Sequence, residues 1–105
     1  MSFEIIVTPF FEKNVKKLKK KYPNIQNDLK YLNEVLSKNK NAGVCLFDKI
    51  YKIRLKNSDV KSKRGGYRVI YYLEYEHKIY LLTIYSKKEK ENITKNEILN
   101  ILYTL

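Results

Sequence analysis

The sequence predicts an α+β fold whose elements follow the order β-α-α-β-β-β-α. In two stretches of the first half, apolar residues recur every three or four positions, whereas in the second half they alternate with polar ones. No linker, repeat or low-complexity segment divides the 105 residues, so we expect one domain spanning 1–105. Because helices and strands are segregated, we expect helices on one face of the sheet. Specifically, a helical hairpin should pack on a largely antiparallel four-stranded sheet.

The first half predicts a short strand and two helices. The β-prone stretch Glu4–Val7 forms the strand, and Thr8 followed by Pro9 is typical of a helix start. The apolar stripe of this helix consists of Phe11, Val15, Leu18 and Tyr22. Pro23 ends the first helix and can open the second, whose short connection favours an antiparallel hairpin. The stripe of the second helix consists of Ile25, Leu29, Leu32 and Leu36.

The second half predicts three strands and a last helix. One side of the first of these strands carries Phe47, Tyr51, Ile53 and Leu55, and the other side carries Lys52 and Arg54. The ranges 67–75 and 79–86 have high β propensity and form the next two strands. The last helix, over Thr94–Leu102, begins with a capping box formed by Thr94 and Glu97.

The last two strands have a predictable register if the turn between them spans 76–77 or 75–78, because the numbers of paired residues then sum to 153. The pairs facing the helices are Val69 with Ile84, Tyr71 with Leu82, and Leu73 with Tyr80. The pairs on the opposite side are Arg68 with Tyr85, Ile70 with Thr83, and Tyr72 with Leu81. With Lys52 and Arg54, the Arg68–Tyr85 pair would make a cationic, tyrosine-bearing surface on the side away from the helices.

Charge favours a polyanionic partner. Lys and Arg number 22 against 11 Asp and Glu, a net charge of +11, which suits nucleic acid, an anionic membrane or an acidic protein. The run Lys13–Lys21 carries six lysines, and it is either a solvated helix face or a surface that docks on ribosomal RNA. No apolar run approaches the roughly 20 residues of a membrane span. Without a signal peptide, we expect a cytoplasmic protein that binds no membrane.

The rare residues exclude several kinds of site. One cysteine, Cys45, excludes an internal disulfide framework and a multi-cysteine metal site. One histidine, His77, excludes a nuclease that uses two histidines, and few carboxylates fall close together, which disfavours a two-metal site. We therefore expect neither metal nor cofactor.

A surface of Arg, Lys and Tyr without carboxylates suits RNA phosphodiester chemistry. Arginine offers planar, bidentate donors to phosphate oxygens. Lysine neutralises developing charge, or acts as a base where neighbouring cations lower its pKa. Tyrosine can stack on a base or move a proton. The ribose 2′-OH would attack its own phosphate, so neither a bound water nor a metal is needed.

Three segments resemble the RelE/ParE superfamily of toxins. Residues 63–72, beginning Lys-Arg-Gly-Gly-Tyr-Arg, resemble the Lys-x-Gly-Gly-x-Arg strand of that family. Residues 81–87, followed by 89–93, are similar to its last strand and exit, and 52–54 to its basic strand. The branch that the chain resembles most is the HigB-type, RelE-like mRNA interferases. This resemblance implies the β-α-α-β-β-β fold with a variable C-terminal segment.

The resemblance also implies an activity. RelE-like toxins cut mRNA in the ribosomal A site and leave a 2′,3′-cyclic phosphate and a 5′-OH. By position, Arg54 and Arg68 would stabilise the scissile phosphate, and Tyr85 would stack on the substrate or protonate it. Lys63 and Lys87 would add charge stabilisation, and one of them would be the base. Further RNA-binding side chains are expected at Lys52, Lys61, Arg64 and Lys88.

The implied partners are mRNA on the ribosome, ribosomal RNA, and a cognate antitoxin encoded by an adjacent gene. In the HigB branch the antitoxin is usually a helix-turn-helix protein, and the two form a hetero-oligomer. Two other functions stay open. A ParE-like toxin would inhibit DNA gyrase by binding, without chemistry, on the same fold. A non-toxic nucleic-acid-binding module, or an inactivated relic, would need only the charge.

Overall fold

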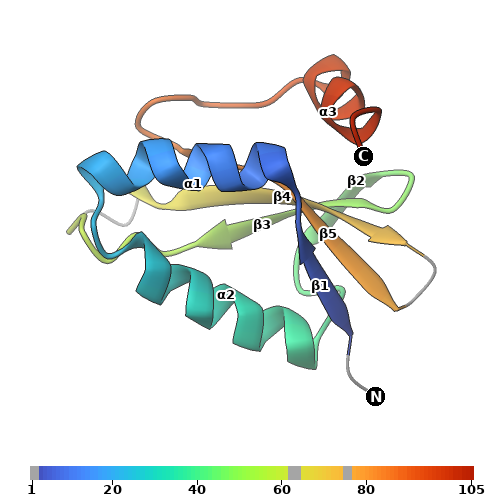
Figure 1. Ribbon diagram of the computed structural model, residues 1–105, viewed down its shortest axis with the longest axis horizontal. Helices are drawn as coiled ribbons and strands as arrows, with labels where there is room; N and C mark the ends of the chain where they lie inside the picture. Colours follow the sequence, from blue (N-terminus) through green and yellow to red (C-terminus); the bar gives the residue numbers. More distant parts are fainter. Residues whose placement is uncertain (1–2, 62–64, 75–76) are drawn as a thin grey trace.

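The computed structural model describes residues 3–61, 65–74 and 77–105 and contains one mixed sheet with three helices (Figure 1). In chain order the elements are β1 (Glu4–Val7), α1 (Pro9–Lys21), α2 (Ile25–Lys38), β2 (Val44–Phe47), β3 (Ile50–Leu55), β4 (Tyr67–Glu74), β5 (Lys78–Ser86) and α3 (Lys95–Leu102). The strand order is β1-β5-β4-β3-β2, with β1 parallel to β5 and the other neighbours antiparallel. The α+β class is confirmed, but the sheet has five strands and not four.

The additional strand arises because the chain turns between Phe47 and Ile50. Asp48 and Lys49 adopt positive φ angles of 37° and 65°, which closes a tight hairpin between β2 and β3. Phe47 pairs with Ile50 and packs on the same side of the sheet, whereas Tyr51 packs on the other side. The predicted placement of Phe47 beside Tyr51 on one strand face is therefore wrong.

Helix α1 begins as the sequence predicts. The Thr8 hydroxyl accepts a hydrogen bond from the Phe11 amide at 3.3 Å and donates one to the Leu81 carbonyl at 2.7 Å, so the cap also ties α1 to β5. The predicted stripe of α1 is buried throughout, as are Ile25, Leu32 and Leu36 of α2. Both helices pack on one sheet face, whose core side chains include Leu55, Val69, Tyr71, Leu73, Ile79, Leu81 and Ile84.

The predicted register of β4 and β5 holds near the candidate site and then shifts by one residue. Arg68 lies opposite Tyr85, as predicted, but an irregularity after Ile70 pairs Tyr71 with Leu81 in place of Leu82. A bulge adds one residue to one strand and so reverses which side chains face the core. Leu82 and Tyr80, predicted to face α1 and α2, therefore pack on the opposite face. The predicted turn residues Tyr75 and Glu76 lie outside the described residues.

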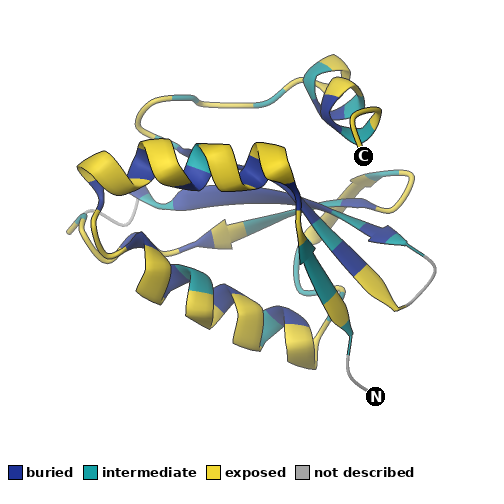
Figure 2. Cartoon of the chain, viewed as in Figure 1, coloured by how far each residue is buried: buried dark blue, intermediate teal, exposed yellow. Residues whose placement is uncertain are grey.

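Helix α3 covers part of that opposite face. Its predicted capping box is present, with Glu97 N–H donating to the Thr94 hydroxyl at 3.1 Å. Ile98 and Ile101 form a second apolar cluster with four sheet residues, Ile50, Ile70, Leu82 and Tyr85. The expectation that all helices share one face is wrong, because the apolar stripe of α3 is buried against the far side of the sheet. Figure 2 shows the resulting buried centre and the exposed outer faces of α1 and α2.

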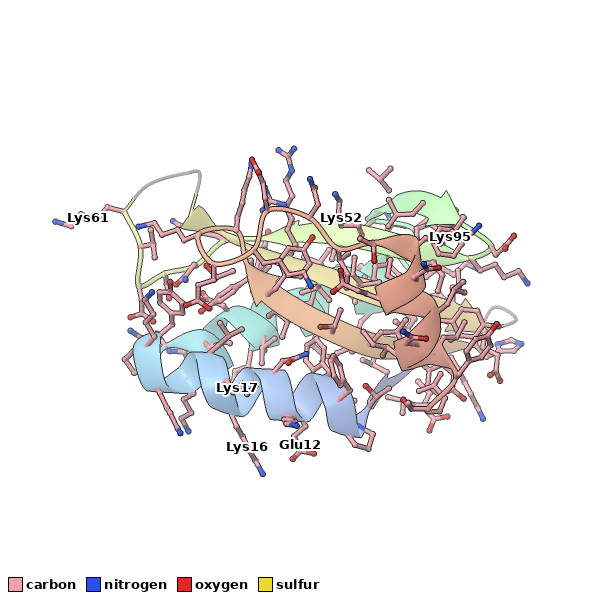
Figure 3. The ribbon with its side chains drawn as sticks, turned by 90° about the horizontal axis from the view of Figure 1, so that it is seen from above. Glu12, Lys16, Lys17, Lys52, Lys61 and Lys95 are labelled. Carbon is pink, nitrogen blue, oxygen red and sulfur yellow. The ribbon has the colours of Figure 1, made fainter. Side chains whose placement is uncertain are left out.

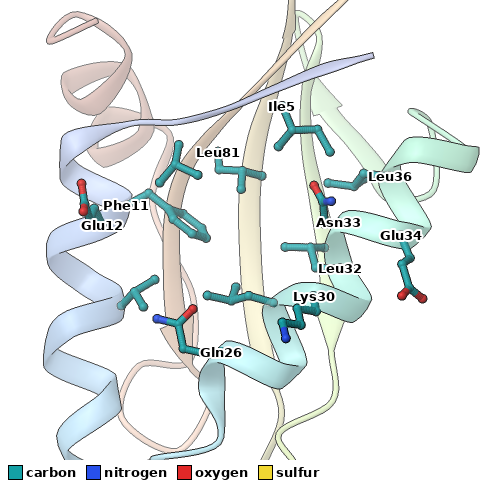
Figure 4. A pocket seen from close by; sticks show the side chains of 13 residues that line it. Ile5, Phe11, Glu12, Gln26, Lys30, Leu32, Asn33, Glu34, Leu36 and Leu81 are labelled. Carbon is teal, nitrogen blue, oxygen red and sulfur yellow. The ribbon is translucent and has the colours of Figure 1, made fainter. Parts of the chain in front are cut away.

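The lysine-rich side of α1 lies away from this second face. Figure 3 shows Lys16 and Lys17 on one side of the molecule and Lys52, on β3, on the other. Helices α1 and α2 also diverge and leave a groove of about 630 Å³ over β5. In Figure 4 its floor is apolar, with Phe11 and Leu81 pointing inward. Within the described ranges, none of the helices is long and apolar enough to cross a membrane.

One buried tyrosine fixes the segment between α2 and β2. The Tyr71 hydroxyl accepts from the Gly43 amide at 3.1 Å and donates to the Lys40 carbonyl at 2.8 Å. We expect Tyr71→Phe to lower the free energy of unfolding by about 1–3 kcal/mol, because it removes the hydroxyl to which both backbone groups are hydrogen-bonded. Urea denaturation measures the change. Tyr72→Phe, on the neighbouring residue, should stay within about 0.5 kcal/mol of wild type, and equal losses for both variants would contradict this role.

Candidate functional site

Three polar side chains lie in a row across the middle of the sheet. Arg54 of β3 is the register partner of Arg68 on β4, and Arg68 is the partner of Tyr85 on β5. Cross-strand partners share a face and have Cβ atoms about 5 Å apart. The structure therefore brings together the three strand residues that the sequence placed on the face away from α1 and α2.

The Arg68 guanidinium is buried without a counter-ion. The residue is 9% exposed, and its Nη1 donates a hydrogen bond to the Tyr67 carbonyl at 3.2 Å. Among the residues that the structure describes, no carboxylate forms an ion pair with it. Burial lowers the pKa of Arg68, and so does the positive charge of Arg54. A guanidinium stays charged in proteins, so among the described residues this cation is without a counter-ion, as an anion-binding site requires.

Tyr85 is beside Arg68 but covered. It is 8% exposed and packs in the cluster with Ile98 and Ile101 of α3. Its hydroxyl is buried and has no hydrogen-bond partner within the described ranges. Burial raises the pKa of Tyr85, which the charge of Arg68 partly opposes. The phenol is therefore protonated at neutral pH and can serve as a donor, whereas its ring is packed with Ile98 and Ile101 and is not open to a stacking base.

The predicted lysines take different positions around this row. Lys52 is half-buried two residues before Arg54, so alternation places it on the same face. The Lys87 amide donates to the Gly66 carbonyl at 3.1 Å, which continues the β4–β5 ladder and puts Lys87 on the face of Tyr85. The Lys88 side chain instead lies against Gly65, where an added Cβ would be 3.1 Å from its Cε. Lys63 and Arg64 lie outside the described residues.

A cleft of about 420 Å³ adjoins the arginines, where β3 ends. Its lining residues are Arg54, Leu55, Lys56, Asn57, Val60, Lys61, Gly66 and Arg68. Four of these are basic and none is acidic. Lys61, predicted to bind RNA, is exposed and extends outward at one end of the molecule in Figure 3.

Sequence reasoning missed two of the polar residues that line the cleft, Lys56 and Asn57. Lys56 continues the alternation of Lys52 and Arg54 by one more step, so the strand pattern could have found it. Asn57 is 2% exposed, and only the fold shows that this polar residue after β3 is buried.

This arrangement can hold and stabilise phosphate. The two arginines provide directed donors in a partly dehydrated place, where such donors act most strongly on developing negative charge. In the part of the chain that the structure describes, no group of three or more His, Cys, Asp or Glu could hold a metal ion.

Comparison with known proteins identifies the fold. No protein-family model matches the chain. Among solved structures, it is similar to a mutant of the E. coli toxin RelE, in the free state, in which two arginines are replaced by alanine. The TM-score is 0.58 and the sequence identity 16%, and the match covers 87% of this chain and 90% of the other. The chain therefore has a RelE-like fold, as the resemblance implied.

A buried charge without a counter-ion destabilises a folded protein. If the role of Arg68 is to bind an external anion, its side chain should therefore lower the stability of the free protein. We expect Arg68→Met, which keeps the aliphatic stem and removes the charge, to raise the free energy of unfolding by about 1 kcal/mol. The matched change Arg54→Met is at an exposed position and should stay within about 0.5 kcal/mol of wild type. Urea denaturation measures both variants. A clear loss of stability in Arg68→Met would mean that the guanidinium is structural.

Proposed function

We propose that this chain is the toxin of a type II toxin-antitoxin module and cleaves mRNA on the ribosome. The observation that carries the proposal is the buried Arg68, which has no ion-pair partner among the described residues and lies between Arg54 and Tyr85 on a RelE-like fold. A cation held out of water without a counter-ion is unfavourable for folding alone, so an anionic substrate gives it a purpose. The absence of acidic residues from the lining of the adjoining cleft suits the same substrate.

The proposed reaction is an internal transfer at phosphorus. The ribose 2′-oxygen attacks the adjacent phosphorus, the P–O5′ bond breaks, and the products carry a 2′,3′-cyclic phosphate and a 5′-OH. Arg68 and Arg54 donate to the non-bridging oxygens, whose negative charge increases in the transition state. Neither a metal nor a cofactor enters this scheme.

Proton transfer is assigned to the flanking groups. Lys63 or Lys87 accepts the proton of the 2′-OH, and the other adds positive charge near the phosphate. Tyr85 is protonated and next to Arg68, so it donates a proton to the leaving 5′-oxygen once its buried hydroxyl has become accessible. Lys52, Lys61, Arg64 and Lys88 bind neighbouring phosphates.

The proposal extends to partners. The toxin belongs to the HigB-type branch, acts in the cytoplasm and docks on ribosomal RNA. Its antitoxin is a helix-turn-helix protein from an adjacent gene, with an acidic or amphipathic segment that covers the basic face. Displacement of RNA by such a segment would be salt-sensitive.

The direct test is primer extension on a defined mRNA, translated in a purified system with this protein. We expect cuts confined to ribosome-occupied codons. Arg68→Ala should reduce cutting by about 10²–10³-fold, because it removes a donor that acts in the transition state. Arg68→Ala should remain folded, as judged by circular dichroism.

Two outcomes would contradict the proposal. Full cutting by Arg68→Ala would remove the assigned role of this residue. Intact mRNA with wild-type protein that arrests growth would favour the gyrase-inhibitor alternative. A supercoiling assay would then show inhibition, whereas the mRNA-cleaving toxin should leave supercoiling normal.

A further inference from the structure

The basic residues of β3 form a ladder that continues past the arginines. Lys52, Arg54 and Lys56 alternate along one face, about 6.6 Å apart at the strand rise. Leu55 lies between Arg54 and Lys56 and is buried in the core under α1 and α2. Its two neighbours therefore point to the opposite side of the sheet. The ladder thus presents three successive cations, with Arg54 and its partner Arg68 in the middle.

The last cation of the ladder lines the cleft where β3 ends. Lys56 is exposed there, opposite Gly66 and Arg68. An added Cβ on Gly66 would be 2.9 Å from the Leu55 carbonyl oxygen and 3.8 Å from Arg68 Nη1. A side chain at this position would therefore narrow the passage between β3 and the buried guanidinium. Glycine keeps the cleft continuous with the Arg54–Arg68 pair.

The loop after β3, residues 56–61, forms the outer wall of the cleft and is hydrogen-bonded to the start of α2. The Asn24 amide and side chain donate to the Asp59 carboxylate at 2.9 and 2.7 Å. The Ser58 amide and hydroxyl donate to Asp28 at 3.0 and 3.1 Å. Both carboxylates near the cleft are thereby engaged by the α2–loop contact, and neither lines the cleft. The wall is pre-formed and positive, which reduces the entropy lost on binding.

The wall also contains an unsatisfied donor. Asn57 is 2% exposed, and its Oδ1 accepts from the Asp59 amide at 2.9 Å. Its Nδ2 is buried and has no acceptor among the described residues.

We propose that a single strand of RNA runs along β3 and that Lys56 binds the phosphate next to the scissile one, inside this cleft. The path rests on the proposed function, which places the scissile phosphate at Arg54 and Arg68. Proteins that bind single-stranded nucleic acid without sequence preference use a positively charged groove that follows the nucleic-acid backbone. Lys56 is then an RNA-binding residue, and the α2–loop contact positions the wall around it.

The test is the salt dependence of binding to a short oligouridylate, measured by fluorescence anisotropy without ribosomes. Each phosphate contact to a single strand contributes about 0.7 to the slope of log K against log salt. We expect Lys56→Ala to reduce the slope by about 0.7 and Lys56→Arg to restore it. Lys30→Ala removes the same charge from the exposed side of α2, which packs on the other face of the sheet, and should leave the slope unchanged.

Several outcomes would overturn the inference. The first is an equal slope for Lys56→Ala and Lys30→Ala, and the second is no binding of the oligouridylate by the wild-type chain at low salt. The third is the same Lys56-dependent slope with an oligoglutamate of equal charge. The last result would assign the ladder to an acidic protein partner. The binding experiment needs no cleavage, so it can be compared with the mRNA cleavage assay. If Lys56→Ala does not change the slope but wild type cuts mRNA, only this inference is contradicted. If Lys56→Ala changes the slope but wild type does not cut mRNA, only the proposed function is contradicted.

Discussion

The candidate site depends on a charged Arg68 that is buried beside the apolar cluster on the α3 side of the sheet. On the side of α1 and α2, the neighbouring residues Tyr67 and Val69 are fully buried. On the other side, Ile70 and Tyr85 pack with α3, and Arg68 points into the same layer. Arg68 is the register partner of the exposed Arg54, and both residues line the adjoining cleft. The unfavourable burial of this charge thus coincides with an opening through which an anion can reach it.

Covering of Tyr85 by α3 gives the site a second property. The apolar cluster that α3 forms with the sheet includes the ring of Tyr85, so the contacts that stabilise α3 also shield this phenol from water. Burial keeps the hydroxyl protonated, as a proton donor must be. The proposed acid is therefore in the protonation state that its role requires, and in the free protein it is covered by the cluster that includes Ile98 and Ile101.

Local sequence signals predicted much of this fold, and contacts between distant segments account for the rest. Thr8 with Pro9, and Thr94 with Glu97, are short-range caps and were predicted correctly. The Arg68–Tyr85 pairing followed from strand period and turn length. The shift after Ile70 followed from neither, because a bulge depends on packing across several strands. The hairpin at Asp48 and Lys49 lacks the glycine that usually marks such a turn.

The candidate site, too, was predicted from the sequence only in part. Alternation along β3 placed Lys52 and Arg54 on one face, but the face that α3 covers could not be read from its own amphipathic pattern. The burial of Asn57 depends on the contact between the loop and α2, which no local pattern encodes. Residue positions on strands were therefore more predictable than access to them.

The central claim is that Arg68 stabilises the transition state at phosphorus more than it binds RNA. The most direct measurement is the single-turnover rate of mRNA cleavage on ribosomes, over a range of toxin concentrations, for wild type and Arg68→Lys. For Arg68→Lys we predict a cleavage rate at saturation that is reduced by about 10²-fold, with a nearly unchanged half-saturating concentration. The reason is that lysine keeps the charge but lacks the planar pair of donors. An unchanged rate at saturation with a raised half-saturating concentration would contradict the central claim.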